Sequence, residues 1–262
     1  MHTEKVINHI VNWLKNYATS AGVNGFVVGV SGGIDSAVTS TLCAKTGLEV
    51  LCIEMPIHQA ASHVTRAQEH ISFLEQNFKN VKSIRTDLTP VFESFKKEVV
   101  ANATQDIVDM ALANTRARLR MSTLYYYAGL YKLLVAGTGN KVEDFGVGFY
   151  TKYGDGGVDV SPIADLLKSQ VYDLGNVLNV PNSIINAAPS DGLFGDARSD
   201  EDQIGASYPE LEWAMKMDDL GKTALDFSGR EQEAFKIYKR FNTANKHKMI
   251  AIPICEIPKA ML

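Results

Sequence analysis

Cysteine is scarce in this chain, and its spacing excludes several kinds of protein. The three cysteines, Cys43, Cys52 and Cys255, form no C-x-x-C pair, which argues against a tRNA-thiolating enzyme that needs paired cysteines. Cys43 and Cys52 fall in helix-like and strand-like apolar runs, so we expect buried free thiols. Such thiols are typical of a reducing compartment, and we therefore expect a cytoplasmic protein.

Metal-binding and membrane patterns are also missing. The six histidines show no H-x-x-x-H or other tight metal spacing, and we expect His58, His63 and His70 at the surface. No apolar run approaches membrane-spanning length, and the first residues lack the pattern of a secretory signal. The formal net charge of -4 argues against general nucleic-acid binding. We expect neither a membrane nor a nucleic-acid partner.

The pattern that is present is an alternation of strand-like and helix-like segments. Apolar runs near residues 26–30, 49–55, 81–85 and 133–136 are separated by segments with helical spacing. This order predicts an α/β fold with a parallel sheet covered by helices on both faces. Ligands of such sheets lie beyond the carboxyl ends of the strands, where the first and fourth runs here meet glycine-rich turns.

One of these turns carries the strongest signal for chemistry. It consists of Gly29, Val30, Ser31, Gly32, Gly33, Ile34, Asp35 and Ser36. Its glycines allow backbone N–H groups to approach an anion at the start of a helix. The serines add hydroxyl donors and Asp35 a carboxylate suited to Mg²⁺. No lysine ends the turn, so it is not the common P-loop. A glycine-rich turn without a ligand is the alternative.

A second carboxylate is expected at the same edge of the sheet. Glu143 follows the fourth strand-like run by a few residues, as Asp35 follows the first. Two carboxylates near phosphate oxygens suit Mg²⁺. The alternatives are helix capping for Asp35 and a surface role for Glu143. Two glycine-rich segments, near 146–160 and 189–206, are expected to be mobile, and the second is either a lid over substrate or a solvated linker.

The turn at Ser31 resembles the Ser-Gly-Gly-x-Asp-Ser loop of the ATP pyrophosphatases, and the whole set of motifs resembles the ammonia-dependent NAD⁺ synthetases. That family also has an arginine-rich helix, Gly-Thr-x-x-x-x-Glu, a Thr-Lys-Tyr-Gly-Asp loop and a late His-Lys pair. Here these motifs occur in the same order, at Ser31–Ser36, Asn114–Met121, Gly137–Glu143, Tyr150–Asp155 with Asp159, and His247–Lys248.

The resemblance implies a fold and a reaction. It implies a doubly wound, Rossmann-like parallel sheet of five strands with helices on both faces, in a single domain over residues 1–262. The implied enzyme is a ligase of NAD biosynthesis: deamido-NAD⁺ is adenylated by ATP, and ammonia then displaces AMP to give NAD⁺. Mg²⁺ is the implied metal, and a homodimer the implied assembly. Because the first helix begins near Met1, we expect no glutaminase domain and free ammonia as the nitrogen donor.

The resemblance also assigns roles to residues. Asp35 and Glu143 would hold Mg²⁺, and Asp35, Lys168 and Asp155 would be catalytic, with Asp155 helping to deprotonate ammonium. The residues implied at ATP are 29–36, Arg118, Thr138, Lys168 and Ser190, and those at deamido-NAD⁺ are Arg116, Lys152, Asp159, His247 and Lys248. Without this resemblance, the arginines would be interpreted as part of a solvated helix face. Lys168 and the His-Lys pair would be interpreted as ordinary surface charges.

Two rival functions stay open. The first is another ATP pyrophosphatase, such as the synthetase part of a GMP synthetase or a tRNA-modifying enzyme. The Thr-Lys-Tyr-Gly-Asp loop and the His-Lys pair speak against it. The second is a nucleotide-binding sensor without turnover, which the paired carboxylates and the glycine-rich segments make a poorer fit.

Overall fold

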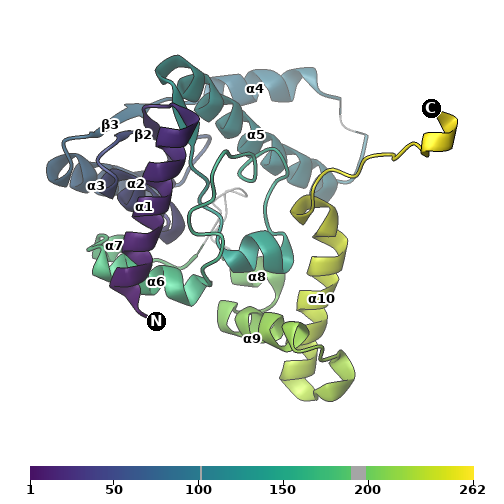
Figure 1. Ribbon diagram of the computed structural model, residues 1–262. Helices are drawn as coiled ribbons and strands as arrows, with labels where there is room; N and C mark the ends of the chain where they lie inside the picture. Colours follow the sequence, from purple (N-terminus) through teal and green to yellow (C-terminus); the bar gives the residue numbers. More distant parts are fainter. Residues whose placement is uncertain (101, 190–198) are drawn as a thin grey trace.

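The computed structural model describes residues 1–100, 102–189 and 199–262 (Figure 1). Ser190 and half of the segment 189–206, which is expected to form a lid or a linker, therefore lie outside the described residues. The strands are β1 (Gly25–Gly29), β2 (Glu49–Glu54), β3 (Val81–Arg85) and β4 (Leu133–Val135). The α-helices are α1 (Thr3–Ala21), α2 (Ile34–Lys45), α3 (Ala61–Asn77), α4 (Thr89–Glu98), α5 (Gln105–Tyr131), α6 (Lys168–Val177), α7 (Asn182–Ile185), α8 (Asp200–Ile204), α9 (Tyr208–Asp219) and α10 (Gly229–Met249). Short helical turns are η1 (Val142–Val147), η2 (Ala224–Asp226) and η3 (Lys259–Met261).

The sheet is parallel and has the order β3-β2-β1-β4. The chain moves outward from β1 to β3 and then returns through α4 and α5 to add β4 on the other side of β1. Strand order thus reverses between β1 and β4, which is where open α/β sheets bind their ligands. The expected alternation of strands and helices, and the position of the glycine-rich turns at this edge, are confirmed.

The expectation of five strands is wrong for the described residues, whose sheet has four. The chain does return beside β4, but it pairs only through one parallel bridge, between Ala136 and Val160. The Asp159 carboxylate accepts the N–H of Val135, and Pro162 has no N–H to donate, so the ladder does not extend. A side chain thus replaces the next backbone hydrogen bond.

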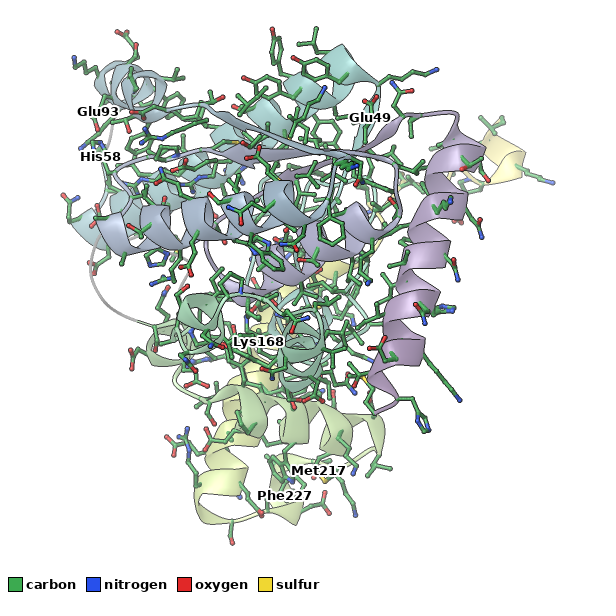
Figure 2. The ribbon with its side chains drawn as sticks, turned by 90° about the vertical axis from the view of Figure 1, so that its left-hand side faces the viewer. Glu49, His58, Glu93, Lys168, Met217 and Phe227 are labelled. Carbon is green, nitrogen blue, oxygen red and sulfur yellow. The ribbon has the colours of Figure 1, made fainter. Side chains whose placement is uncertain are left out.

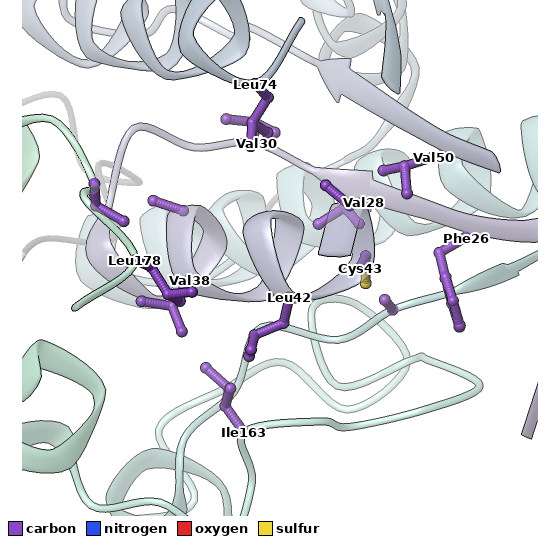
Figure 3. Close-up of a cluster of buried hydrophobic side chains, with 14 of the residues drawn as sticks. Phe26, Val28, Val30, Val38, Leu42, Cys43, Val50, Leu74, Ile163 and Leu178 are labelled. Carbon is purple, nitrogen blue, oxygen red and sulfur yellow. The ribbon is translucent and has the colours of Figure 1, made fainter. Parts of the chain in front are cut away.

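Two apolar clusters cover the two faces of the sheet. On one face, Phe26 and Val28 of β1 pack with side chains of α1, α2, α3 and α6, and Figure 3 shows them near Leu42 and Cys43 of α2. On the other face, Val27 packs with Phe92 of α4 and Ala128 of α5. Because successive strand residues point to opposite faces, a continuous apolar run is required in β1. Cys43 and Cys52 are buried free thiols, as expected.

A third apolar cluster lies away from the sheet. It joins α9 and α10 to η1 through Leu211, Phe235 and Val142, all of them buried. Figure 2 shows this helical part around Met217 and Phe227, opposite the sheet, with Lys168 between the two parts. No helix within the described ranges is long and apolar enough to span a membrane.

His70 is a correction to the surface position expected for it. Its side chain is completely buried between α2 and α3, and its Nε2 lies 2.9 Å from the Ser40 hydroxyl. On α3 it shares one face with Ala67, Ile71 and Leu74, so helical spacing carries it into the core. Burial lowers the pKa of His70 to about 4, and the ring is neutral at physiological pH.

The close approach of β1 to β2 gives a testable prediction. A Cβ at Gly25 would lie 1.9 Å from the Glu49 carbonyl oxygen, so Gly25→Ala must push the two strands apart. We expect this change to lower the free energy of unfolding by about 1–3 kcal/mol. Gly129→Ala is the matched control. It lies in the exposed part of α5 with nothing within 4 Å, and it should raise stability by up to ~1 kcal/mol. Equal effects in urea unfolding would contradict the steric argument.

Candidate active site

The turn after β1 is held in shape by its own serines. The Ser31 and Ser36 hydroxyls lie 3.1 Å apart, the Ser31 N–H donates to Ser36 Oγ, and the Gly33 N–H donates to Ser31 Oγ. Ser36 Oγ also donates to the Gly33 carbonyl oxygen. These bonds place the turn at the N-terminus of α2, where backbone N–H groups and the helix dipole favour an anion.

Glycine is required at position 32 for two reasons. Its φ of +83° lies in the left-handed region, and a Cβ there would lie 2.6 Å from the His63 carbonyl oxygen of α3. Arg66, also on α3, donates from Nε to the Gly32 carbonyl oxygen at 3.2 Å. The turn therefore lies directly against α3, and a bulkier residue would displace it.

A buried cluster of charges lies beside this turn. The Lys168 ammonium is 2.5 Å from Asp35 Oδ2 and 3.0 Å from Glu143 Oε1, and the lysine side chain is only 4% exposed. Burial by itself would favour the neutral amine, but the two carboxylates outweigh it and raise the pKa of Lys168. Lys168 is therefore charged, and it joins the starts of α2 and α6 to the turn after β4.

Two further residues support the carboxylates. Asn140 is completely buried; its Nδ2 donates to Asp35 Oδ1 at 3.0 Å, and its Oδ1 accepts the N–H groups of Val142 and Glu143. Tyr208 at the start of α9 donates its hydroxyl to Glu143 Oε1 at 2.5 Å. The Tyr208 ring lies 4.8 Å from the Lys168 ammonium. Asp35 and Glu143 are thus oriented from three different elements.

These groups open into one large cavity of about 590 Å³, a size suited to a small-molecule ligand. Its walls include the whole of residues 29–36 with Thr138, Glu143, Asp155, Lys168 and Lys248. The structure therefore brings together most of the residues expected at ATP and both expected metal ligands.

Two more acids lie near the cluster. Burial, with Glu143 adding to it, raises the pKa of Asp144 to about 8, so this side chain is mainly neutral at pH 7. Asp155 is exposed as a residue, yet its carboxyl group is desolvated and accepts the Thr151 N–H at 2.9 Å. Desolvation raises the pKa of Asp155 to about 6. Asp155 is therefore ionised at neutral pH and can accept a proton.

The residues expected at deamido-NAD⁺ are only partly gathered. Lys152 Nζ donates to the His247 carbonyl oxygen at 2.6 Å, and Arg118 donates to the Lys152 carbonyl oxygen at 3.4 Å. Lys248 donates to the carbonyl oxygens of Gly148 and Tyr150. These contacts join the C-terminal end of α10 to the glycine-rich segment after η1. The mobility expected of that segment stays a prediction.

Arg116 and Asp159 lie elsewhere. The Arg116 guanidinium lies over the Phe92 ring at 4.5 Å. Asp159 accepts the Tyr125 hydroxyl at 2.9 Å and lines a second cavity of about 400 Å³. The other walls of that cavity are Trp13, Tyr17, Phe145, Val160, Ser161, Ala164 and Asp165.

The donor set fits a magnesium ion that shares its coordination with phosphate. Asp35 and Glu143 both lie within reach of one cation, as their contacts with the Lys168 ammonium demonstrate. Within the described ranges no group of three or more His, Cys, Asp and Glu side chains could hold a metal. Mg²⁺ commonly uses one or two carboxylates and completes its shell with waters and substrate phosphates.

Sequence reasoning missed Asn140 and Tyr208. Asn140 lies inside the glycine-rich turn after β4, so its position was a usable signal, although its bond to Asp35 spans 105 positions. Tyr208 precedes a proline at the start of a helix and has no local mark of function. Its contact with Glu143 depends on how α9 packs against the sheet part.

Comparison with known proteins decides the family. The family model described as NAD synthase matches residues 6–251. The chain belongs to the NAD synthase family. A member from Methanosarcina mazei, an NH3-dependent NAD⁺ synthetase, is 36% identical over 98% of this chain and 100% of its own. A Malacoplasma penetrans protein of the same name is 40% identical over 79% of this chain and 81% of its own.

Solved structures of similar proteins support the family assignment, and one of them is named for a different product. An NH3-dependent NAD synthetase from Campylobacter jejuni is similar, with a TM-score of 0.77 and 27% identity over 98% of this chain and 100% of its own. An NMN synthetase from Francisella tularensis is also similar, with a TM-score of 0.83 and 32% identity over 99% of both chains. Structures of this family thus include relatives named for two different products.

Proposed function

We propose that this NAD synthase, acting as one domain over residues 1–262, joins ammonia to the carboxylate of deamido-NAD⁺ at the expense of ATP. The observation that carries the proposal is the pair of carboxylates, Asp35 and Glu143, beside a serine- and glycine-rich anion cradle in one cavity. The names of the Methanosarcina mazei and Campylobacter jejuni relatives support ammonia as the nitrogen donor. The buried free thiols support a cytoplasmic setting.

The first step needs several anions to meet. The substrate carboxylate attacks the α-phosphorus of ATP, the bond to the β-phosphate oxygen breaks, and pyrophosphate leaves with the electron pair. The turn at residues 29–36 presents backbone N–H groups and two hydroxyls to the phosphates, while Thr138 lines the same cavity. Bound Mg²⁺ would supply positive charge for the phosphate oxygens, held by Asp35 and Glu143. Lys168 lines the same cavity and offers its ammonium to the phosphates.

The second step is aminolysis of the acyl-adenylate. Ammonia attacks the activated carbonyl carbon, AMP leaves, and the nitrogen must lose protons. Asp155 lines the cavity with a carboxyl group whose pKa of about 6 suits a proton acceptor at neutral pH. We propose that it takes the proton of the incoming ammonium. No nucleophilic side chain is required, because ATP itself activates the carboxylate.

The second substrate is either a mononucleotide or a dinucleotide. The Francisella tularensis relative, an NMN synthetase, favours nicotinic acid mononucleotide, whose carboxylate could react in the same way. The second cavity favours the dinucleotide, because Trp13, Tyr17 and Phe145 offer aromatic surfaces on which a base can stack beside Asp159. In this interpretation Lys248 contacts deamido-NAD⁺ from the wall of the main cavity, and Arg116, Lys152 and His247 contact the parts of it outside that cavity.

A homodimer is proposed on the basis of exposed apolar side chains. The chain after α10 runs away from the body of the protein (Figure 1), and Ile250, Ile252 and Ile254 are between 47% and 78% exposed. Tyr126 and Leu130 on α5 are also more than half exposed. A second copy of the chain would remove such surfaces from water.

The first prediction concerns products. With ATP, Mg²⁺, ammonium and deamido-NAD⁺, we expect AMP and NAD⁺ in equal amounts, and Asp35→Ala should lose both because a carboxylate of the metal pair is removed. Nicotinic acid mononucleotide is assayed in parallel.

Trp13→Ala should raise KM about tenfold for deamido-NAD⁺, by loss of ~1–3 kcal/mol of stacking, and leave the KM for the mononucleotide unchanged.

Each result separates the candidates. A clear preference for the mononucleotide, with no effect of Trp13→Ala on either substrate, would favour nicotinic acid mononucleotide as the substrate. AMP formed only with another carboxylate would keep the ATP half and reject the nicotinate substrates. ATP binding without any turnover would favour the sensor.

The second prediction concerns Asp155. We expect Asp155→Asn to lower kcat/KM for ammonia about 100-fold at neutral pH, the lower end for loss of a general base. The deficit should shrink at alkaline pH, where free ammonia needs no base. In the wild type, activity should fall below about pH 6, because the carboxyl group is then protonated. ATP–pyrophosphate exchange is the control and should be unchanged. Identical pH profiles for ammonia would remove Asp155 from this role.

The third prediction concerns assembly. At micromolar concentration the full chain should sediment as a dimer, and removal of residues 250–262 should weaken the dimer because the exposed isoleucines are lost. A shorter truncation that removes only 259–262 serves as the control. A full-length monomer under these conditions would contradict the proposal.

A further inference from the structure

The Lys168 ammonium lies between the two carboxylates that fit a metal ion. It contacts Asp35 Oδ2 at 2.5 Å and Glu143 Oε1 at 3.0 Å, and these are the two carboxylates that fit Mg²⁺. The rest of its surroundings are also filled, since the Tyr208 ring lies 4.8 Å away and the side chain is 4% exposed. The lysine is thus fully engaged without any ligand.

The two cations exclude each other on geometry and on charge. Mg²⁺ binds oxygen at about 2.0–2.1 Å, so an ion held by Asp35 Oδ2 and Glu143 Oε1 would overlap the space now taken by the ammonium. The two carboxylates carry two negative charges, of which Lys168 already compensates one. A divalent ion beside an ammonium in a poorly solvated site would meet strong repulsion.

We infer that Lys168 is a built-in competitor of the metal: its ammonium holds the cation position between Asp35 and Glu143 until nucleotide phosphates arrive. This inference rests on the proposed function, because it takes these carboxylates as the metal pair. Phosphates offer the ammonium a new anionic partner inside the same cavity, which Lys168 lines. Lysine suits such a transfer, since its charge sits on a flexible four-carbon stem.

The inference has a consequence for the order of binding. Metal alone cannot displace the lysine without leaving a buried ammonium unpaired, which is costly. When metal and nucleotide bind together, the carboxylates pair with the metal and the Lys168 ammonium pairs with the phosphates. No charged group is then left without an opposite charge. The metal therefore enters with the nucleotide, and the same event turns Lys168 toward the phosphates.

The test measures Mn²⁺ binding by the electron paramagnetic resonance signal of the free ion, without nucleotide. We expect wild-type protein to bind Mn²⁺ weakly, and Lys168→Met to bind it at least ~10-fold more tightly, because two carboxylates are left without a counter-ion. Lys168→Arg keeps the charge and should resemble the wild type. With a non-hydrolysable ATP analogue present, wild-type protein should bind Mn²⁺ tightly.

Equal Mn²⁺ affinities of wild type and Lys168→Met without nucleotide would overturn the inference. If Lys168→Met does not fold, wild type is compared with Asp35→Asn. Equally weak binding by both supports the inference, and tight binding by wild type that is lost in Asp35→Asn overturns it. The titration is independent of turnover: NAD⁺ formation by a protein that binds Mn²⁺ tightly alone defeats only this inference. Metal exclusion without NAD⁺ formation defeats only the proposed function.

Discussion

A buried ammonium between two carboxylates is the interaction on which the site depends. Lys168 begins α6, Asp35 begins α2, and Glu143 belongs to the turn after β4, so one charged group joins three segments. An unpaired charge in this position would cost several kcal/mol, whereas here each charged group lies beside an opposite charge. One ammonium compensates only one of the two carboxylates, so further hydrogen-bond donors, Asn140 and Tyr208, surround the cluster. Asn140 donates to Asp35 Oδ1, which Lys168 does not contact, whereas Tyr208 donates to Glu143 Oε1, the same oxygen that contacts the ammonium.

The site lies at the boundary between two differently built parts. The sheet part supplies the rigid turn after β1, whose position is determined by a parallel ladder on both sides and by close packing on α3. The helical part around α9 and α10 supplies Tyr208 and Lys248. Backbone N–H groups that favour an anion come from the first part, whereas the two carboxylates come from the start of α2 and from η1.

The family chemistry and the site agree on one physical problem. ATP and a nicotinate nucleotide are both anions, and the cavity is itself rich in carboxylates. Attraction must come from backbone N–H groups and from the cationic side chains that line the cavity, Arg66, Arg120, Lys168 and Lys248. Neutral Asp144, whose pKa is raised to about 8 by burial, limits the negative charge beside the metal pair at pH 7.

Local pattern determined a large part of this protein. The apolar run of β1, the Ser-Gly-Gly-x-Asp-Ser turn and the helical spacing of α5 are properties of neighbouring residues, so the parallel sheet and the position of Asp35 at its glycine-rich edge followed from the sequence. Tertiary structure alone decided the rest. The contact of Lys168 with Asp35 spans 133 positions, and within the described residues the sheet ends at β4, where the Asp159 carboxylate takes the Val135 N–H. Such pairings arise through space between distant segments, and no local periodicity encodes them.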